Sequence, residues 1–407
     1  MTAMEKNNKT LNVPNLRFPE FSGEWEKGTL QAVATLSKGT GISKDQLSED
    51  GQSCILYGEL YTKYRSEIID TIISKTDIDP KRLVRSQTND VIIPCSGESA
   101  VDIATARCVK QSDVLLGGDL NIIRLKGEHD GSFFAYQLNG KRKYDIAKVA
   151  QGVSVVHLYG EHLKGVKVNY PSSAEQKKIS SLLALIDQRI ETQKKIIEDL
   201  KKLKDAISKS LFLRTDLLEK RIHISEIGNL KNGYAFQSSS YDDNGEYEIV
   251  TISNVTGDRN ICSDGCNRIL TKPSDLQSHQ ELKYGDILIS LTGNVGRVSL
   301  CSEGKFLLNQ RVGLLKLNAG VNAEYIYQVI STKRFEQAMI SCGQGAAQMN
   351  ISKGDIENYN VPYSDNSSVL LHIASILKTS DACILVESRK LQLLKIQKRH
   401  LLTQMFI

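Results

Sequence analysis

The 407-residue sequence lacks the features that would assign it to a membrane or secreted class. It has no run of about 18 apolar residues, so no membrane span is predicted. The opening stretch "MTAMEKNNKTLNVPNLRFPEF" has no apolar core and is not a secretory signal. The eight cysteines form no CxxC pair, and the closest two, Cys262 and Cys266, have no second ligand pair to complete a zinc site. These absences favour structural or surface thiols in a reducing cytoplasm.

Motifs of catalysis are also missing. There is no GxxxxGK[ST] phosphate loop, and "TGNVGR" (292–297) resembles a turn between strands more than a dinucleotide fingerprint. No two prolines are adjacent, which excludes the Asn-Pro-Pro-aromatic motif of amino-methyltransferases. His157 and His162 lie five residues apart without HExxH spacing. We therefore predict no catalytic, cofactor-binding or metal site in this chain, and favour a binding subunit over an enzyme.

What the sequence does contain is a soluble composition of moderate charge. The apolar fraction of 40% and the charged fraction of 24% fit folded cores, and the length predicts more than one domain. The net charge of +5 permits a polyanionic partner without demanding one.

The chain repeats itself at an offset of about 194 residues. "ISSLLALIDQRI" (179–190) falls on "IASILKTSDACI" (373–384), which places Asp187 on Asp381. Upstream, "NDVIIPCSG" (89–97) matches "GDILISLTG" (285–293), and "AQGVSVVHLYGEHLKGVKV" (150–168) matches "GQGAAQMNISKGDIENYNV" (343–361). "KGTGI" (38–42) lies over "NGYAF" (232–236). Each half is thus predicted to be a globular segment of about 150 residues followed by one long helix.

Each predicted long helix carries an apolar seam at alternating spacings of four and three residues, typical of a coiled coil. The apolar seam positions are Ile179, Leu183, Ile186, Ile190, Ile197, Leu200, Ile207, Leu211, Ile373, Leu377, Ile384, Leu391, Leu394, Leu401 and Met405. Polar residues interrupt the seam at equivalent positions, Gln193 with Glu387 and Lys204 with Lys398. Because the two helices match, we expect them to pair with each other; a surface helix packed on its own domain is the alternative. Ser173 and Gln176 suggest a capping box at the start of the first helix.

The globular segments are predicted to be mixed α/β. Strands are expected at 53–60, 90–94, 121–125, 247–253, 286–291 and 312–317, and helices at 132–138 and 323–340. The fold class is therefore α+β, with two tandem mixed α/β domains, each followed by a long helix. The helices are expected to pair as an antiparallel coiled coil with pseudo-two-fold symmetry.

This arrangement resembles the specificity (S) subunit of type I restriction-modification systems. "VPNLRFPEFSGEW" (13–25) is similar to the usual lead-in, and "ISEIGNLKNGYAF…GEYEIVTISNVTGD" (224–258) to the start of a target recognition domain. "GDILISLTGNVGRV" (285–298) resembles the strand pair of that domain, and residues 172–212 resemble the central spacer helix. Residues 43–90 and the second linker (363–373) depart from the family's pattern. The corresponding boundaries are 1–171 for the lead-in and first recognition domain, 172–214 for the central helix, 215–364 for the second recognition domain and 365–407 for the C-terminal helix.

The resemblance implies a non-catalytic, cytoplasmic subunit that reads a split sequence in double-stranded DNA, one half-site per recognition domain. The paired helices would be the spacer between the half-sites. Two methyltransferase (M) subunits and two motor-nuclease (R) subunits are the implied protein partners, with no membrane. S-adenosylmethionine, ATP and Mg²⁺ would belong to those subunits and not to this chain. The helix from Ile179 to Phe212 would span roughly 50 Å, about one to one and a half turns of B-DNA.

Basic and amide side chains near the repeated loops are the candidates for DNA contact, since cations bind phosphates and Arg, Asn and Gln bind base edges. The candidates are Lys38, Lys63, Arg65, Arg107, Lys141, Arg142, Lys143, Lys231, Asn294, Arg297, Arg311, Gln344, Gln348 and Asn350. For each, a solvated surface position or a turn hydrogen bond is the alternative. The lysines of "KKLK" (201–204) are expected on a solvated helix face.

Two other functions stay open at this point. The chain could be a coiled-coil scaffold that binds proteins and no nucleic acid. It could also be a nuclease with an unrecognised site, for which Asp77, Asp79 and Lys81 are candidates, although "DIDPKR" equally fits a charged turn.

Overall fold

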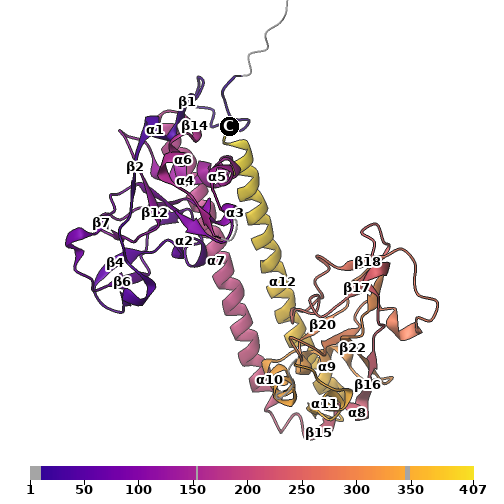
Figure 1. Cartoon of the computed structure of the whole chain (residues 1–407). Helices are drawn as coiled ribbons and strands as arrows, with labels where there is room; N and C mark the ends of the chain where they lie inside the picture. The colour runs from indigo at the N-terminus through magenta and orange to yellow at the C-terminus, as the bar shows by residue number, and fades with distance from the viewer. Residues whose placement is uncertain (1–10, 153–154, 344–348) are drawn as a thin grey trace, which may run out of the picture. The chain divides into compact units, whose positions relative to one another are not determined.

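The structure, a computed structural model, describes residues 11–152, 155–343 and 349–407. The chain divides into two compact units, and the boundaries between them fall inside the two long helices. Unit 1 comprises Met1–Lys194 with Lys390–Ile407, and unit 2 comprises Lys195–Arg389. Each unit therefore contains one globular domain and part of each long helix (Figure 1).

Unit 1 begins with a lead-in and ends in the first part of helix α7. In chain order its elements are β1 (Glu26–Thr29), α1 (Leu30–Val33), β2 (Ala34–Lys38), η1 (Lys44–Gln46), β3 (Leu47–Ser48), β4 (Gln52–Ile55), α2 (Glu59–Thr62), β5 (Ile68–Ile69), β6 (Ser74–Thr76), η2 (Pro80–Arg82), β7 (Val84–Arg85), β8 (Asp90–Pro94), β9 (Ser96–Gly97), α3 (Ala100–Ile103), β10 (Arg107–Val109), β11 (Leu115–Leu116), β12 (Leu120–Leu125), α4 (Gly131–Asn139), α5 (Lys143–Val149), β13 (Val156–His157), α6 (Gly160–Lys164), β14 (Lys167–Tyr170) and α7 (Ser173–Phe212).

Unit 2 follows the same plan with fewer strands among the described residues. Its elements after α7 are β15 (Lys220–His223), α8 (Ile224–Ile227), β16 (Gly228–Asn232), η3 (Ser238–Ser240), β17 (Tyr247–Val250), β18 (Asn267–Ile269), η4 (Ser278–Gln280), β19 (Ile287–Ser290), β20 (Val298–Leu300), β21 (Phe306–Leu308), β22 (Val312–Leu317), α9 (Ala323–Ile330), α10 (Lys333–Cys342), α11 (Lys353–Glu357), β23 (Asn360–Tyr363) and α12 (Ser367–Gln404).

The main sheets of the two units have equivalent strands in the same order. Unit 1 has the order β2-β12-β8-β10-β5, and unit 2 has β16-β22-β19-β20. The register is repeated as well, because Lys38 pairs with Asn121 in unit 1 and Asn232 pairs with Gly313 in unit 2. A two-stranded ribbon, β1-β14 or β15-β23, leads into the long helix in each unit. The tandem duplication predicted from the sequence is confirmed.

The core of each unit lies between the main sheet, a buried helix and the long helices. In unit 1, Phe133 of α4 packs on Phe406, which follows the last turn of α12, with ring centroids 5.1 Å apart. In unit 2 the equivalent pair is Tyr325 of α9 and Phe212 of α7, with centroids 6.1 Å apart. Each globular domain therefore packs against both long helices.

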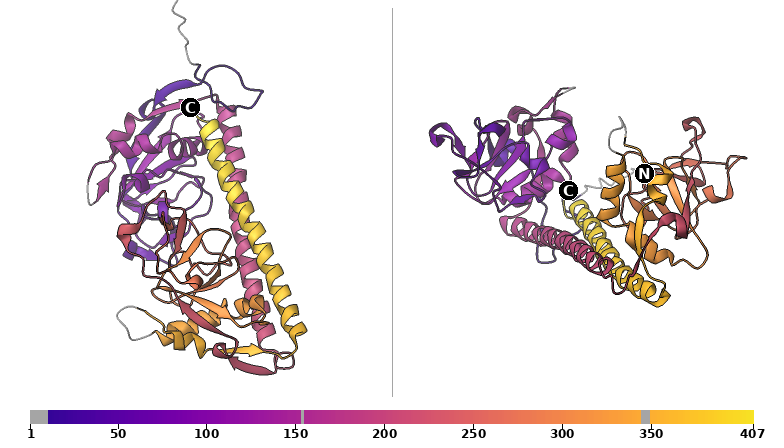
Figure 2. Two further views of the ribbon diagram at one scale, coloured as in Figure 1. Left: turned by 90° about the vertical axis from the view of Figure 1, so that its right-hand side faces the viewer. Right: turned by 90° about the horizontal axis from the view of Figure 1, so that it is seen from below.

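The two long helices lie side by side within each unit, as both views of Figure 2 show. In unit 1 the start of α7 and the end of α12 share one core, which includes Ile179, Leu183 and Met405. In unit 2 the end of α7 and the start of α12 share another, which includes Phe212, Ile373 and Leu377. Pairing is therefore antiparallel within each unit. All fifteen apolar seam positions are buried or half-buried, while the face opposite them is exposed.

The start of α7 corrects one detail of the sequence analysis. Ser172, and not Ser173, accepts a hydrogen bond from the Glu175 backbone N–H. The Ser173 hydroxyl instead donates to the Glu128 carbonyl, and the Gln176 amide donates to the Pro171 carbonyl. The predicted capping box is therefore wrong, because Ser173 binds Glu128 and the Gln176 Oε1 accepts from the Asp130 backbone N–H.

Most predicted strands are found with small shifts in their ends. Residues 90–94 and 312–317 match β8 and β22 in full. The stretch 53–60 is a strand only to Ile55 and then turns into α2. The helix predicted at 323–340 is two helices, α9 and α10, because the Thr332 side chain caps a new N-terminus.

Helix α12 is long and apolar enough, by length and composition alone, to cross a membrane. Its seam nevertheless packs against α7 in unit 2, and its Asp381 carboxylate binds two cationic side chains. One face of the helix therefore lies in a protein core, while its opposite face is exposed.

Candidate nucleic-acid interface

One end of each main sheet gathers loops from several parts of the chain. In unit 1 this end is formed by the end of β2, the β8–β9 connection, the turn before β12 and strand β13. In unit 2 the same end is formed by the end of β16, residues 290–297, the turn before β22 and residues 349–352. We call this end the loop edge of each unit. Loops held on a rigid sheet are the usual place for recognition residues.

The loop edge of unit 1 carries a basic and aromatic cluster. Lys38, exposed at the end of β2, has its Nζ 5.5 Å from the centroid of the Tyr159 ring. The His157 and Tyr159 rings stack with centroids 6.1 Å apart, and both side chains are exposed. Asn121 nearby is fully buried and donates to the Leu158 carbonyl, while no atom in the described part of the chain donates a hydrogen bond to its Oδ1. The cluster therefore presents the Lys38 ammonium, the His157 imidazole and the Tyr159 phenol ring on one surface.

The loop edge of unit 2 carries amides and arginines instead. Arg311 and Asn294 are exposed on adjacent loops, and Asn350 pairs with Thr292 in an isolated β-bridge. Arg297 is half-buried, with its Nε 3.4 Å from an oxygen of Glu336. Lys231, half-buried, precedes the last residue of β16. Several residues predicted to bind DNA therefore lie at this edge, and their contact with DNA stays a prediction.

The remaining candidates of the first half lie on elements that do not form the loop edge as defined above. The Lys63 ammonium binds Glu59 at 2.7 Å and the Ser74 hydroxyl at 3.1 Å. The Arg142 guanidinium contacts Asp145 and the Ile407 carbonyl. Burial, followed by the nearby Arg107 cation, lowers the pKa of Lys143. Arg65 and Lys141 are exposed.

Arg107 has a structural role that the sequence did not indicate. Its side chain is only 8% exposed, and its guanidinium donates to the carbonyls of Leu60 and Tyr64. Burial lowers its pKa, against the opposing effect of Glu67 and Asp187. The side chain is therefore engaged inside unit 1 and is not presented to a ligand at the surface.

Gln344 and Gln348, two further candidates, lie outside the described residues.

His157 and Tyr159 were missed as contact candidates, although the repeat contained a signal for one of them. The match of 150–168 with 343–361 places His157 on Asn350, which was selected. The structure confirms that equivalence, since His157 pairs with Ser96 as Asn350 pairs with Thr292. Tyr159 had no such signal, because its equivalent is Ser352, the cap of α11.

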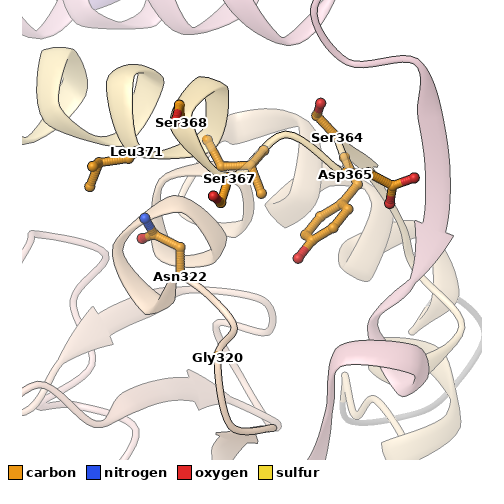
Figure 3. A pocket seen from close by; sticks show the side chains of 9 residues that line it. Gly320, Asn322, Ser364, Asp365, Ser367, Ser368 and Leu371 are labelled. Carbon is orange, nitrogen blue, oxygen red and sulfur yellow. The ribbon is translucent and has the colours of Figure 1, made fainter.

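A cleft of about 430 Å³ lies elsewhere in unit 2, at the start of α12 (Figure 3). It is lined by Asn322, Asp365, Ser367 and Ser368 among others. The cleft residue Asn322 follows the C-terminal end of strand β22, whereas Arg311 of the loop edge precedes the N-terminal end of the same strand. The Ser364 hydroxyl there donates to Glu219, which also accepts from the Asp365 backbone N–H. Its polar groups therefore hold the β23–α12 connection in place.

Tandem units of one fold, each with a loop edge and each packed on paired long helices, define a class of two-domain proteins linked by a helical spacer. A family model described as "Type I restriction modification DNA specificity domain" matches residues 22–202 and again residues 220–395. These matches cover more than half of the chain, so the chain belongs to the type I restriction-modification DNA specificity family. Its globular domains are target recognition domains, and recognition of DNA sequence follows from the family.

Solved structures show the same fold. The crystal structure of a type I restriction-modification S subunit from M. genitalium has 19% sequence identity and a TM-score of 0.62. It covers 97% of this chain and 99% of its own. A chain from a study of complex assembly and conformational transition of the type I R-M system has 12% identity and a TM-score of 0.50, covering 93% of this chain and 96% of its own. Family members are specificity subunits and are generally non-catalytic.

Proposed function

We propose that this chain reads a bipartite sequence in double-stranded DNA, with one half-site bound by each unit. The observation that carries the proposal is that the loop edges of the two units have the same backbone arrangement but carry different side chains. Lys38, His157 and Tyr159 of unit 1 correspond to Asn232, Asn350 and Ser352 of unit 2. Because donors, acceptors and cations distinguish bases in the major groove, different side chains on one plan would select two different half-sites.

The chain would act as the non-catalytic specificity subunit of a larger complex in the cytoplasm. Two M subunits would methylate adenine with S-adenosylmethionine, after flipping the base from the duplex. Two R subunits would carry out restriction with ATP and Mg²⁺. The helix pair would serve as the spacer between half-sites, with this chain itself holding no cofactor or metal.

The test is to co-express the chain with its M subunit and map modified adenines by single-molecule sequencing. A split, asymmetric motif is expected. If no new motif is found, the scaffold function is favoured instead. Metal-dependent cleavage of DNA by the purified chain alone would favour the nuclease.

A further inference from the structure

A buried ion pair joins the two long helices in each unit, at equivalent positions of the repeat. In unit 1 the Lys398 Nζ of α12 lies 2.7 Å from the Asp187 Oδ1 of α7. In unit 2 the Lys204 Nζ of α7 lies 2.6 Å from the Asp381 Oδ1 of α12. The aspartates are 8% and 7% exposed. The seam lysine that the sequence placed on a solvated face is therefore paired across the helix interface.

A third partner comes from the globular domain and is again equivalent in the two units. The Tyr136 hydroxyl of α4 donates to the Asp187 Oδ2 at 2.7 Å. The Gln328 side-chain amide of α9 donates to the Asp381 Oδ2, also at 2.7 Å. Tyr136 and Gln328 each lie six residues after the N-cap of their helix, Asp130 or Asn322. We call each three-residue contact of aspartate, lysine and domain side chain a helix lock.

The two helix locks differ in how their charges are balanced. In unit 1, Lys398 also binds the Glu67 Oε2 at 2.6 Å, so one ammonium serves two carboxylates. In unit 2, Asp381 forms ion pairs with the Arg259 Nη1, at 2.9 Å, and with Lys204. One carboxylate there binds two cations. Arg259 in turn makes a two-pronged ion pair with Glu324. The lock of unit 1 therefore depends on a single lysine, whereas the lock of unit 2 has a second cation.

Stability alone does not account for a buried polar cluster at this place. Burying charged groups costs nearly as much as their attraction returns, so an apolar seam residue would serve as well for stability. A directional cluster instead favours one arrangement of the elements that meet in it, as polar seam residues do in coiled coils. Here three elements meet, namely both long helices and the buried helix of the domain.

We propose that the helix locks fix how each recognition domain is seated on the helix pair and thereby set how strictly the gap between half-sites is read. This inference rests on the proposed function. One base pair corresponds to about 3.4 Å of duplex. A loosened seat that let a domain shift by about that distance would allow binding of sites with a gap one base pair longer or shorter. Lys398, Asp187, Lys204 and Asp381 would then be positioning residues for the gap and would not touch DNA.

The experiment compares methylation by the assembled complex on substrates that carry the two native half-sites at the native gap and at gaps one base pair longer and shorter. The measured quantity is the ratio of the rates at altered and native gaps. Lys398→Met is expected to raise that ratio by about tenfold or more. Lys204→Met is expected to raise it less, because Asp381 keeps Arg259 and Gln328. Lys398→Arg, which preserves an ion pair, is expected to restore the native ratio.

Two further variants separate positioning from folding. Asp187→Asn with Lys398→Met removes one charge of each sign and so leaves the net charge of the site unchanged, although Glu67 loses its ion pair with Lys398 and keeps only the nearby Arg107 cation. Lys209→Met alters an exposed lysine of α7, the helix that carries Asp187 and Lys204, and is the matched control. The ratio of rates is expected to be unchanged in this variant. An unchanged ratio in the folded double variant overturns the inference, while the split motif of the wild-type complex still supports the proposed function. Absence of a split motif in the wild type overturns both. A change in the half-site bases, with the gap still strict, also overturns the inference.

Discussion

Arg107 and Arg311 show how differently one residue type is used in this chain. Arg107 is buried in unit 1 and donates to two backbone carbonyls. Arg311 is exposed at the loop edge of unit 2, where its backbone N–H donates to the Asn309 side chain and its carbonyl accepts from the Leu291 N–H. The first residue is therefore expected to affect stability and the second DNA affinity.

Arg107→Met should lower the free energy of unfolding by about 2–3 kcal/mol, because the Leu60 and Tyr64 carbonyls lose their donors. Arg311→Ala should change stability by less than about 0.5 kcal/mol and weaken DNA binding. If Arg311 contacts a phosphate, the salt dependence of binding should fall by about one unit of slope. Urea denaturation and fluorescence anisotropy of the methyltransferase complex measure the two effects. A stable Arg107→Met variant with weakened DNA binding would contradict this assignment.

The charge balance around Lys398 leads to a prediction about pH. Burial raises the pKa of Asp187, although Lys398 opposes the effect, whereas Lys398 holds the pKa of Glu67 down against burial. Removing the ammonium in Lys398→Met leaves both carboxylates buried beside each other, so both pKa values should lie above their unfolded values. A carboxyl with a raised folded pKa costs stability while it is ionised, and that cost disappears as it takes up a proton.

The destabilisation by Lys398→Met should therefore be largest near pH 7 and should shrink as the pH falls towards about 5. Other charged groups near the site are Arg65, Arg107, Glu191, Lys194, Lys395 and Arg399. Of these, Arg107 lowers the pKa of Glu67 and limits its rise. Urea denaturation of both proteins from pH 5 to 8 measures the difference. A destabilisation that stays constant or grows towards pH 5 would exclude the two facing carboxylates as its cause.

At the scale of elements, the long helices are stabilised mainly where a seam position meets a domain core. Leu377 is fully buried in the core of unit 2, while Leu371 of the same helix is 62% exposed. Leu377→Ala should cost about 3–5 kcal/mol of unfolding free energy, because truncation leaves a cavity. Leu371→Ala, the matched control, should change stability by less than about 0.5 kcal/mol. Similar losses for both variants in thermal unfolding would contradict the assignment of the seam.

The helices can also be lengthened where the units meet, without altering either core. Seven residues inserted between Lys194 and Lys195, and seven between Arg389 and Lys390, leave the contacts inside each unit intact. Two helical turns add about 10 Å, which corresponds to about three base pairs. The methylated motif should keep both half-sites and gain a gap about three base pairs longer. A gap of unchanged length would refute the role of the helices as a spacer.

Sequence periodicity predicted the elements well where the signal is local. Strands β8 and β22 are short and mostly apolar, and α7 has a seam of regular four and three spacing without Gly or Pro. The prediction failed where tertiary contacts compete with local preference. Ser173 binds the Glu128 carbonyl and Gln176 accepts from the Asp130 backbone N–H, which leaves the cap to Ser172.

At the scale of the whole molecule, the repeat implies that the two recognition domains act separately. Replacing residues 1–171 by the first recognition domain of another family member should change one half-site and leave the second half-site unchanged. Single-molecule sequencing of DNA methylated by the chimaera with the native M subunit provides the measurement. A change in both half-sites would show that the units do not act independently. The reciprocal exchange of residues 215–364 is the control, and it should change only the other half-site.

The duplication, the helix seams and the resemblance to the family could all be predicted from the order of residues, because each is a pattern along the chain. The sequence also placed Lys204 on Lys398 and Asp187 on Asp381. That these lysines bind those aspartates is visible only in the folded chain, since the partners Lys204 and Asp381 are 177 residues apart. The same is true of Arg107, whose burial depends on neighbours from α2 and the turn after it, and of Tyr159, which meets Lys38 only at the folded loop edge. Periodicity indicates which face of an element is buried, but the particular side chains that meet there depend on how distant elements pack together.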